Sequence, residues 1–255
     1  MKLDDARSAL YFGENMEERS EIEGLPPHLH GVRTFVDVGA SFGQYTFHAD
    51  RIIRGGRLIA VEADPLWFSR LEANIREWSS KSTNKLEAVH AAVSDRTGPI
   101  SFFTNGVISG AGFASKGREF DMPGLKWRQI TVNAVTLDDL LRDVDPDFVK
   151  IDIEGFEYRA LAGATRILAG KRCRFLIEVH PWGDPTLSKK PEDLFTLMYL
   201  SGYDFQRYHR HWIFSPSRSR IKRTIKYHAV RFVWRHEKLK ELLKHLAVKW
   251  DSRRR

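Results

Sequence analysis

The stretch TFVDVGASFG, residues 34–43, is a short apolar run followed by two glycines. Similar apolar runs recur along the chain, and longer amphipathic stretches separate them. Continuous apolar strands that alternate with helices are typical of a parallel sheet whose two faces are both covered. The predicted strands are 34–38, 57–61, 86–93, 148–153 and 175–179, and the predicted helices are 43–53, 65–78, 154–168 and 191–200.

Two further segments, 203–207 and 211–214, predict an antiparallel pair that closes this sheet. We therefore expect an α/β fold, a Rossmann-like doubly wound and mostly parallel seven-stranded sheet. The predicted domain occupies residues 33–215. A polar leader at 1–32 precedes it, and a basic helical tail at 216–255 follows it.

Composition excludes several classes of protein. Hydrophobic residues make up 42% and charged residues 29% of the chain, which excludes a disordered or fibrous protein. No apolar run reaches the roughly 18 residues of a membrane-spanning helix, and the N-terminus lacks the apolar region of a secretory signal. The single cysteine, Cys173, has no partner for a disulfide, and we interpret it as inert. A cytoplasmic protein is the default expectation.

The net charge of +8 is concentrated at the C-terminus, where residues 217–255 hold 14 Lys and Arg against 3 Asp and Glu. Leucines and a tryptophan between 239 and 250 recur at helical spacing, with lysines on the other faces. Such a helix suits an anionic membrane surface, and its charges would also hold nucleic-acid phosphates. A third interpretation is a helix docked on the domain with its charges in solvent. We rank membrane contact ahead of nucleic acid.

The turn after the first strand has the residues of a ligand-binding loop. Gly39 and Gly43 suit a tight turn that a ligand approaches closely, and Asp37 at the strand tip can accept a hydrogen bond from a cationic group. An acid here would repel a diphosphate, whereas it would attract an amino-acid ammonium. The turn therefore favours S-adenosylmethionine over a dinucleotide.

The next two strand ends agree with an adenosyl ligand. Glu62 ends the second strand 23 residues after Gly39, where an acid commonly holds the two hydroxyls of a ribose. The third strand, within 90–95, changes from apolar to polar residues and suits a slot for adenine.

These segments resemble the FkbM-type family of S-adenosylmethionine-dependent methyltransferases. The resemblance implies a class I methyltransferase fold and methylation of hydroxyl oxygens, often on natural products or sugars. The segments that carry it are FVDVGASFGQYT (35–46), LIAVEADP (58–65), HAAVSD (90–95), VTLDDLL (135–141), FVKIDIEGFEYRALAGA (148–164) and FLIEVH (175–180). The cofactor residues that we predict from the strand ends and the resemblance are Asp37, Gly39, Ala40, Gly43, Tyr45, Glu62, Ala63, Ala92 and Val93.

Strands four and five end in acids and a histidine. Asp152 and Glu154 are two residues apart, as are Glu178 and His180, so in extended chain each pair points to one face. Ligands of open α/β sheets bind outside these strand ends. We predict that His180 removes a proton from a hydroxyl acceptor, and that Asp152 or Glu178 orients its imidazole.

A rival interpretation gives the same three side chains to a divalent ion. Asp152, Glu178 and His180 would hold Mg²⁺ or Mn²⁺, and the metal would acidify the acceptor hydroxyl. No local motif demands a metal, so we favour the histidine as base. A purely structural role of the three residues is the remaining interpretation.

The main hypothesis is thus an O-methyltransferase acting on a hydroxylated small molecule, sugar or glycan. One alternative is an RNA methyltransferase that uses the basic tail. Against it, the fourth strand carries KIDIEG rather than the Asn/Asp-Pro-Pro-aromatic box of enzymes that methylate exocyclic amines. The other alternative is a non-catalytic S-adenosylmethionine-binding scaffold, which the acidic set at the strand ends disfavours.

Several other features have weaker interpretations. Residues 105–127 carry five glycines and little periodicity, and we predict either a lid over the substrate or a surface loop. A strand at 131–135 and a short helix at 136–141 follow, with Thr136 and Asp139 as a capping box. His209 and His211 are predicted surface histidines, and Trp182 a core or rim aromatic.

Overall fold

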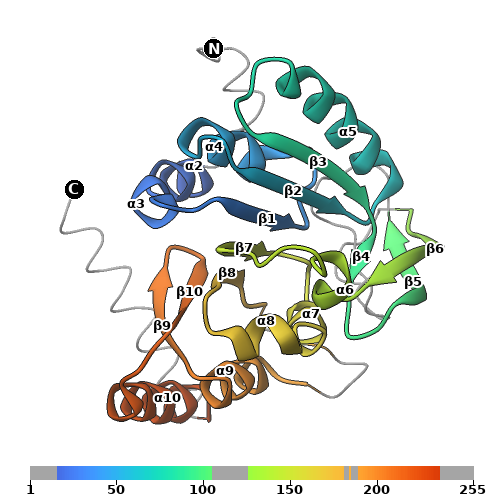
Figure 1. Ribbon diagram of the computed structural model, residues 1–255. Helices are drawn as coiled ribbons and strands as arrows, with labels where there is room; N and C mark the ends of the chain where they lie inside the picture. The colour runs from blue at the N-terminus through green and yellow to red at the C-terminus, as the bar shows by residue number, and fades with distance from the viewer. Residues whose placement is uncertain (1–15, 105–125, 181–183, 185–188, 236–255) are drawn as a thin grey trace.

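The computed structural model describes residues 16–104, 126–180, 184 and 189–235. Its main sheet has seven strands in the order β3-β2-β1-β7-β8-β10-β9 (Figure 1). All neighbours are parallel except β10, which runs antiparallel to β8 and β9. The strands are β1 (Thr34–Val38), β2 (Arg57–Glu62), β3 (Lys85–His90), β7 (Phe148–Ile151), β8 (Arg174–Glu178), β9 (Tyr203–Tyr208) and β10 (His211–Pro216). The predicted fold is confirmed.

Both faces of the sheet are covered because alternate residues of each strand point in opposite directions. In β1, Val36 and Val38 face one cluster of buried side chains and Phe35 faces another. Helices α2 to α5 lie on one side of the sheet, and α6 to α9 lie on the other (Figure 1). Their bounds are α2 Met16–Glu23, α3 Pro26–Leu29, α4 Gln44–Ile52, α5 Pro65–Ser79, α6 Leu137–Leu140, α7 Glu157–Ala162, α8 Thr165–Gly170 and α9 Pro191–Leu200.

The strand order reverses between β1 and β7. From β1 the chain continues outward to β2 and β3, and it later returns to β7 and β8 on the other side of β1. Ligands of open α/β sheets bind in the crevice at such a reversal, outside the carboxyl ends of the strands. The loop after β1 and the loop after β7 are therefore the two sides of the expected site.

The predicted strand at 86–93 is two strands. The main sheet contains β3, which ends at His90, and the chain then enters a second sheet of order β4-β6-β5. The strand predicted at 131–135 is confirmed within β6, and Thr136 caps α6 by accepting from the Asp139 amide. The second sheet consists of β4 (Ala92–Val93), β5 (Gly98–Thr104) and β6 (Arg128–Val135).

The helix predicted at 154–168 begins later and is interrupted. It begins at Glu157 because Glu154 and Gly155 adopt φ values of +56° and +103°, outside the helical region, and it is divided into α7 and α8. Gly163 lies at the break, where an added Cβ would be 2.3 Å from the Ser94 carbonyl oxygen.

The segment expected as a polar leader contributes buried side chains. Ile22, Leu25 and Leu29 are at most 1% exposed and belong to the cluster beneath β1. Pro26 lies in the first turn of α3, where proline is well tolerated.

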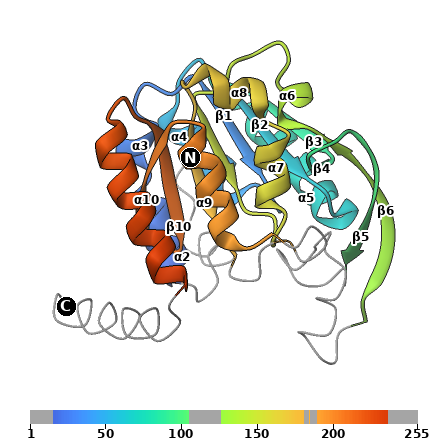
Figure 2. The ribbon, with the colours of Figure 1, turned by 90° about the horizontal axis from the view of Figure 1, so that it is seen from below.

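Part of the basic tail is helix α10 (Arg220–Arg235), which runs beside α9 (Figures 1 and 2). Tyr227 is buried, and its ring stacks on Tyr199 with centroids 4.4 Å apart. The stripe predicted between 239 and 250 lies outside the described residues.

Candidate active site

The loop after β1 is shaped by glycines at positive φ. Gly39 has φ +75°, and a Cβ there would lie 1.9 Å from the Asp152 carbonyl oxygen. Gly43 has φ +97°, and its Cβ would meet side-chain atoms of Leu71 and Trp78 at about 3 Å. Gly39 therefore permits the loop after β1 to touch the backbone after β7, which holds the two sides of the crevice together.

Glu62 lies directly beside this loop, as its place in the sequence predicts. Its Oε2 accepts from the Ser41 amide at 2.7 Å, and its Oε1 accepts from the Asp64 amide at 2.8 Å. Burial is the largest influence on this carboxyl and raises its pKa to about 7. Each oxygen retains a lone pair, so the side chain can still accept from two hydroxyls.

Asp37 is fully buried rather than open to a ligand. Its Oδ2 accepts from the amide and the hydroxyl of Thr46, at 3.1 and 2.8 Å. Its Oδ1 lies 3.4 Å from the ammonium of Lys150. The structure thus shows Asp37 holding the start of α4 and neutralising Lys150. Direct contact with a cofactor ammonium stays a prediction.

The remaining predicted cofactor residues do not share one surface. Tyr45 is 5% exposed, and its hydroxyl donates to Glu21 on α2. Ala92 and Val93 are buried in β4, where Ala92 packs among side chains of the second sheet. Ala63 accepts from the His90 ring at 3.2 Å, and Ala40 is buried against α5.

Lys150, which the sequence did not single out, connects the two sides of the crevice. Its Nζ donates to the Gly39 carbonyl oxygen at 3.0 Å and lies 3.7 Å from Asp152 Oδ2. The side chain is 3% exposed. Burial alone would lower its pKa, but Asp37 and Asp152 outweigh burial and raise it. The charged lysine therefore links the glycine loop to the predicted catalytic aspartate.

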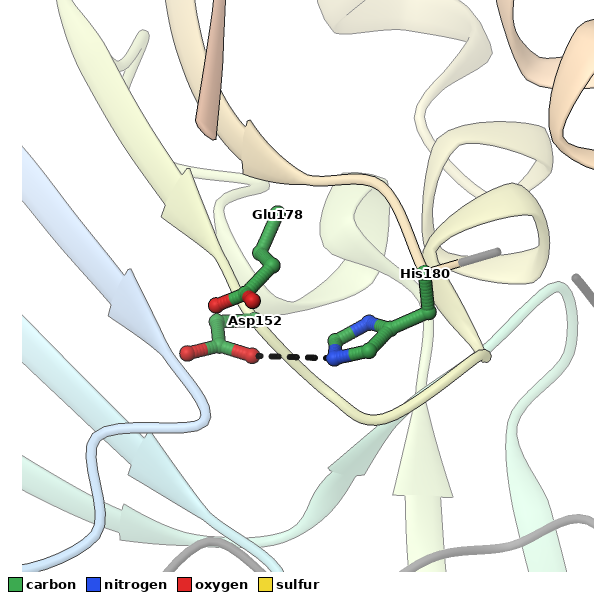
Figure 3. A group of neighbouring side chains, drawn as sticks. All are labelled: Asp152, Glu178 and His180. Atoms are coloured by element: carbon green, nitrogen blue, oxygen red, sulfur yellow. Dashed lines mark ion pairs between the residues drawn. The ribbon is translucent and has the colours of Figure 1, made fainter. Parts of the chain in front are cut away.

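The three predicted catalytic side chains do converge (Figure 3). Asp152 follows β7, Glu178 ends β8, and His180 lies two residues further on. One potential ligand atom from each lies within 4.8 Å of the others. This distance would allow a shared cation, and it also lets the imidazole and the carboxylates act on one substrate group.

The group that orients His180 is Glu157, not Asp152 or Glu178 as predicted. The Nδ1 atom of His180 lies 2.8 Å from Glu157 Oε1, and Glu157 also accepts from the Gly155 amide. The other ring nitrogen, Nε2, lies 3.6 Å from Glu154. It lies 3.9 Å from Asp152, the pair marked by the dashed line in Figure 3. Glu157 holds the ring so that Nε2 points into the cluster.

The electrostatic surroundings make His180 strongly basic. Burial lowers its pKa, but the facing carboxylates of Glu157, Asp152 and Glu154 outweigh burial and raise it to about 9. At neutral pH the ring is therefore protonated. His180 can accept a substrate proton only in its neutral form.

The two carboxylates differ in their affinity for protons. Burial raises the pKa of Asp152, but Lys150 and His180 outweigh it, so the net shift is downward. Burial and the charge of Asp152 raise the pKa of Glu178, although His211 and Arg210 oppose this. Two carboxylates whose pKa values are shifted in opposite directions are common in sites where one stays ionised and the other exchanges a proton.

The prediction that His211 is a surface histidine was wrong. His211 is 0% exposed because it begins β10, between β8 and β9 and beneath α2. Its Nδ1 lies 2.5 Å from Glu21 Oε1, and its Nε2 lies 3.8 Å from Glu178 Oε2.

The interpretation of Cys173 agrees with the structure: the thiol is buried, and burial raises its pKa well above the usual value. The predicted lid, apart from its last two residues, and Trp182 lie outside the described residues.

Comparison with known proteins gives one family. Residues 37–207, two thirds of the chain, match the sequence model described as the methyltransferase FkbM domain. No curated protein matches the chain.

Among solved structures, the chain is similar to methyltransferase FkbM from Methylobacillus flagellatus KT, with 18% identity and a TM-score of 0.49. That match covers 81% of this chain and 56% of the other, so this chain spans little more than half the length of that protein. A second is the precorrin-6y C5,15-methyltransferase from Geobacter metallireducens GS-15, with 15% identity and a TM-score of 0.40; the match covers 76% of this chain and 85% of that one. A third is the magnesium protoporphyrin IX methyltransferase from Synechocystis PCC 6803 with bound S-adenosylmethionine. Its identity is 9% and its TM-score 0.43, and the match covers 84% of this chain and 90% of that one.

Proposed function

The chain belongs to the FkbM family of S-adenosylmethionine-dependent methyltransferases, and from this premise we propose that it methylates a hydroxyl oxygen of a small molecule, sugar or glycan. The observation that supports an oxygen acceptor is the cluster of Asp152, Glu178 and His180 at the carboxyl ends of β7 and β8. A hydroxyl must lose its proton as it attacks, and this cluster offers groups to receive it.

Glu62 and the glycine loop are the proposed cofactor site. The carboxylate of Glu62 would accept from the two ribose hydroxyls, since it lies beside the loop and keeps lone pairs free. Lys150 would keep the loop and Asp152 at a fixed separation, because it contacts both. Asp37 acts behind the loop through Thr46 and Lys150.

His180 would act as the base in its neutral form. Its Nε2 takes the proton of the acceptor hydroxyl while the oxygen forms a bond to the methyl carbon. The carbon–sulfur bond breaks, and its electron pair stays on sulfur. Glu157 then stabilises the imidazolium through Nδ1.

A second route to the same product uses a divalent ion. This route is compatible with the spacing of Asp152, Glu178 and His180, because one atom of each could bind a single cation. The ion would acidify the hydroxyl directly. We keep His180 as the preferred base, and the effect of a chelator on turnover distinguishes the two.

A screen for methyl transfer tests the proposed acceptor. The full chain is incubated with S-adenosylmethionine carrying a labelled methyl group, together with hydroxylated small molecules, glycans, primary amines or RNA. We expect label on hydroxyl oxygens only. Label on RNA or amines alone would overturn the proposal and favour the nucleic-acid interpretation of the basic tail.

We also propose that α10 brings the enzyme to an anionic membrane, near a glycan or lipid-linked acceptor. Tyr227 docks the helix on α9, while Ile221, Ile225 and Phe232 are 75%, 65% and 55% exposed. Lysines and arginines on the same helix would attract anionic lipids. Among the described residues, no helix has the length and apolar character to cross a bilayer.

A further inference from the structure

We propose that Glu21, acting through the buried imidazole of His211, positions the carboxylate of Glu178 at the methyl-transfer site. This inference rests on the proposed function. Neither Glu21 nor His211 lies within residues 37–207, the part that matches the family. They would be positioning residues outside the matched segment, one on each side of it.

The first link joins α2 to β10. Glu21 and His211 are both 0% exposed, and Glu21 Oε1 lies 2.5 Å from His211 Nδ1. The Tyr45 hydroxyl donates to the same carboxylate oxygen at 2.7 Å. Burial raises the pKa of Glu21, but His211 and Tyr45 outweigh it and lower the pKa, so the carboxylate is ionised.

The second link joins β10 to the site. His211 and Glu178 are directly opposite each other in the antiparallel pair of β10 with β8. His211 Nε2 lies 3.8 Å from Glu178 Oε2, and Arg210 lies at the same distance from that oxygen. The rigid imidazole therefore has one nitrogen at the Glu21 carboxylate and the other towards Glu178.

Helix α2 is held firmly enough to transmit this constraint. The Tyr208 hydroxyl donates to the backbone oxygen of Glu21 at 2.6 Å. Ile22 and Leu25 are buried in the cluster that also contains Ile213 of β10. Glu21 is thus fixed by its main chain, by its neighbours and by its side chain, against β9 and β10 of the main sheet.

A buried polar pair is a costly way to fasten a helix. Taking polar groups out of water is unfavourable, and well-packed apolar residues of similar volume often stabilise a protein as well or better. Apolar packing already fastens α2 through Ile22 and Leu25. The pair beside Glu178 is therefore better explained by control of that carboxylate than by attachment of the helix.

The first test needs no substrate. The side-chain carboxyl of glutamate is labelled with ¹³C, and the Glu178 resonance is assigned with Glu178→Gln. In Glu21→Gln we expect the Glu178 resonance to move, and in Glu21→Asp to return part of the way. The matched control is Leu25→Ala, which loosens the same cluster without touching the pair and leaves the resonance in place. An unmoved resonance in Glu21→Gln overturns the proposal.

The second test measures turnover in a preparation whose folded fraction is known. Glu21→Gln should lower kcat about 10- to 100-fold, because displacing a side chain of the site by up to about 1 Å can cost about 100-fold in rate. Its affinity for S-adenosylhomocysteine should stay unchanged, and Leu25→Ala should keep its kcat. Equal kcat losses in both variants would show that α2 only stabilises the fold. If the wild type methylates no hydroxyl while the Glu178 resonance moves in Glu21→Gln, the proposed acceptor fails and the positioning stands.

Discussion

The ammonium of Lys150 lies 3.4 Å from the carboxylate of Asp37, and both side chains are almost completely excluded from solvent. The pair stands between the glycine loop and Asp152, which Lys150 also approaches. The carboxylates of Asp37 and Asp152 thus lie on either side of the same ammonium group. The relationship explains how two strands on either side of the reversal share one electrostatic centre.

Replacing Lys150 with Met should destabilise the fold by about 3–5 kcal/mol, the usual cost of leaving a buried charge without its partner. Urea unfolding measures the free energy. The control is Lys85→Met, whose ion pair with Glu87 is largely exposed on the lysine side and should cost less than about 1 kcal/mol. Equal losses in the two variants would contradict the role of Lys150.

Gly39→Ala should both destabilise the chain and abolish binding of S-adenosylhomocysteine. The new Cβ would meet the Asp152 carbonyl oxygen, and φ +75° is strained for alanine, so we expect a loss of more than about 1 kcal/mol. Calorimetry and thermal unfolding measure the two effects. Gly170→Ala is the control, because nothing lies within 4 Å of its Cβ. Normal binding by Gly39→Ala would refute the packing argument.

Affinity for S-adenosylhomocysteine should rise with pH through about 7, the pKa of Glu62. Ribose hydroxyls donate to the ionised carboxylate, so binding favours the deprotonated form and weakens where the carboxyl is protonated. We expect about a 10-fold gain between pH 6 and pH 8. Calorimetry at the two pH values should show this gain in the wild type and in the exposed control Glu72→Gln. In Glu62→Gln, binding should be weaker and independent of pH.

Turnover should rise with pH towards about 9, because His180 must be neutral to accept a proton. The stability of the fold should change with pH in the opposite direction. A raised histidine pKa contributes stability that is complete below about pH 6.5 and is lost as the pH rises through about 9. Glu157→Gln removes the main partner of the imidazolium and should move the rise in kcat to lower pH.

His180→Ala should lower turnover about 10²- to 10⁴-fold while cofactor affinity is retained. Initial rates and calorimetry measure these separately. If a chelator abolishes the activity of the wild type and Mg²⁺ or Mn²⁺ restores it, the metal route replaces the histidine base. Unchanged turnover in His180→Ala excludes the base.

Binding to anionic vesicles should depend on the exposed face of α10. Changing Ile221, Ile225 and Phe232 together to Glu should abolish co-sedimentation at low salt, because it removes the apolar contacts and reverses part of the charge. Leu200→Glu is the control, since Leu200 is 74% exposed but lies on α9. The triple substitution leaves intact the face of α10 that carries Tyr227 and packs on α9. Equal binding by both variants would contradict membrane attachment through this face.

Features carried by neighbouring residues could be predicted from the sequence. The apolar runs that became β1, β2, β7 and β8 identify strands buried on both faces, because such strands need no polar alternation. Parallel strands also bring their carboxyl ends to one edge. For that reason Glu62 could be predicted beside the glycine loop, and Asp152, Glu178 and His180 could be predicted together.

Breaks within helices and strands could not be predicted from the sequence. The strand predicted at 86–93 leaves the main sheet after His90, since Ala92 and Val93 pair with β6 instead. The helix predicted at 154–168 begins only at Glu157 because Glu154 and Gly155 turn with positive φ beside the site. It is divided at Gly163 and Ala164, where the backbone leaves the helical conformation. In both cases tertiary contacts outweigh a continuous local pattern.

By itself the sequence determined the succession of strands and helices along the chain, the glycine turn and the acids at the strand tips, since each depends on residues a few positions apart. Only the tertiary structure decided which charged groups meet. Glu157 orients His180 across 23 positions, Lys150 reaches back to Gly39, and Glu21 meets His211 from opposite ends of the fold. Whether a histidine is buried or exposed depends on the elements that cover it. His211 becomes buried only when β10 pairs with β8 and α2 closes over them, which no local pattern of residues specifies.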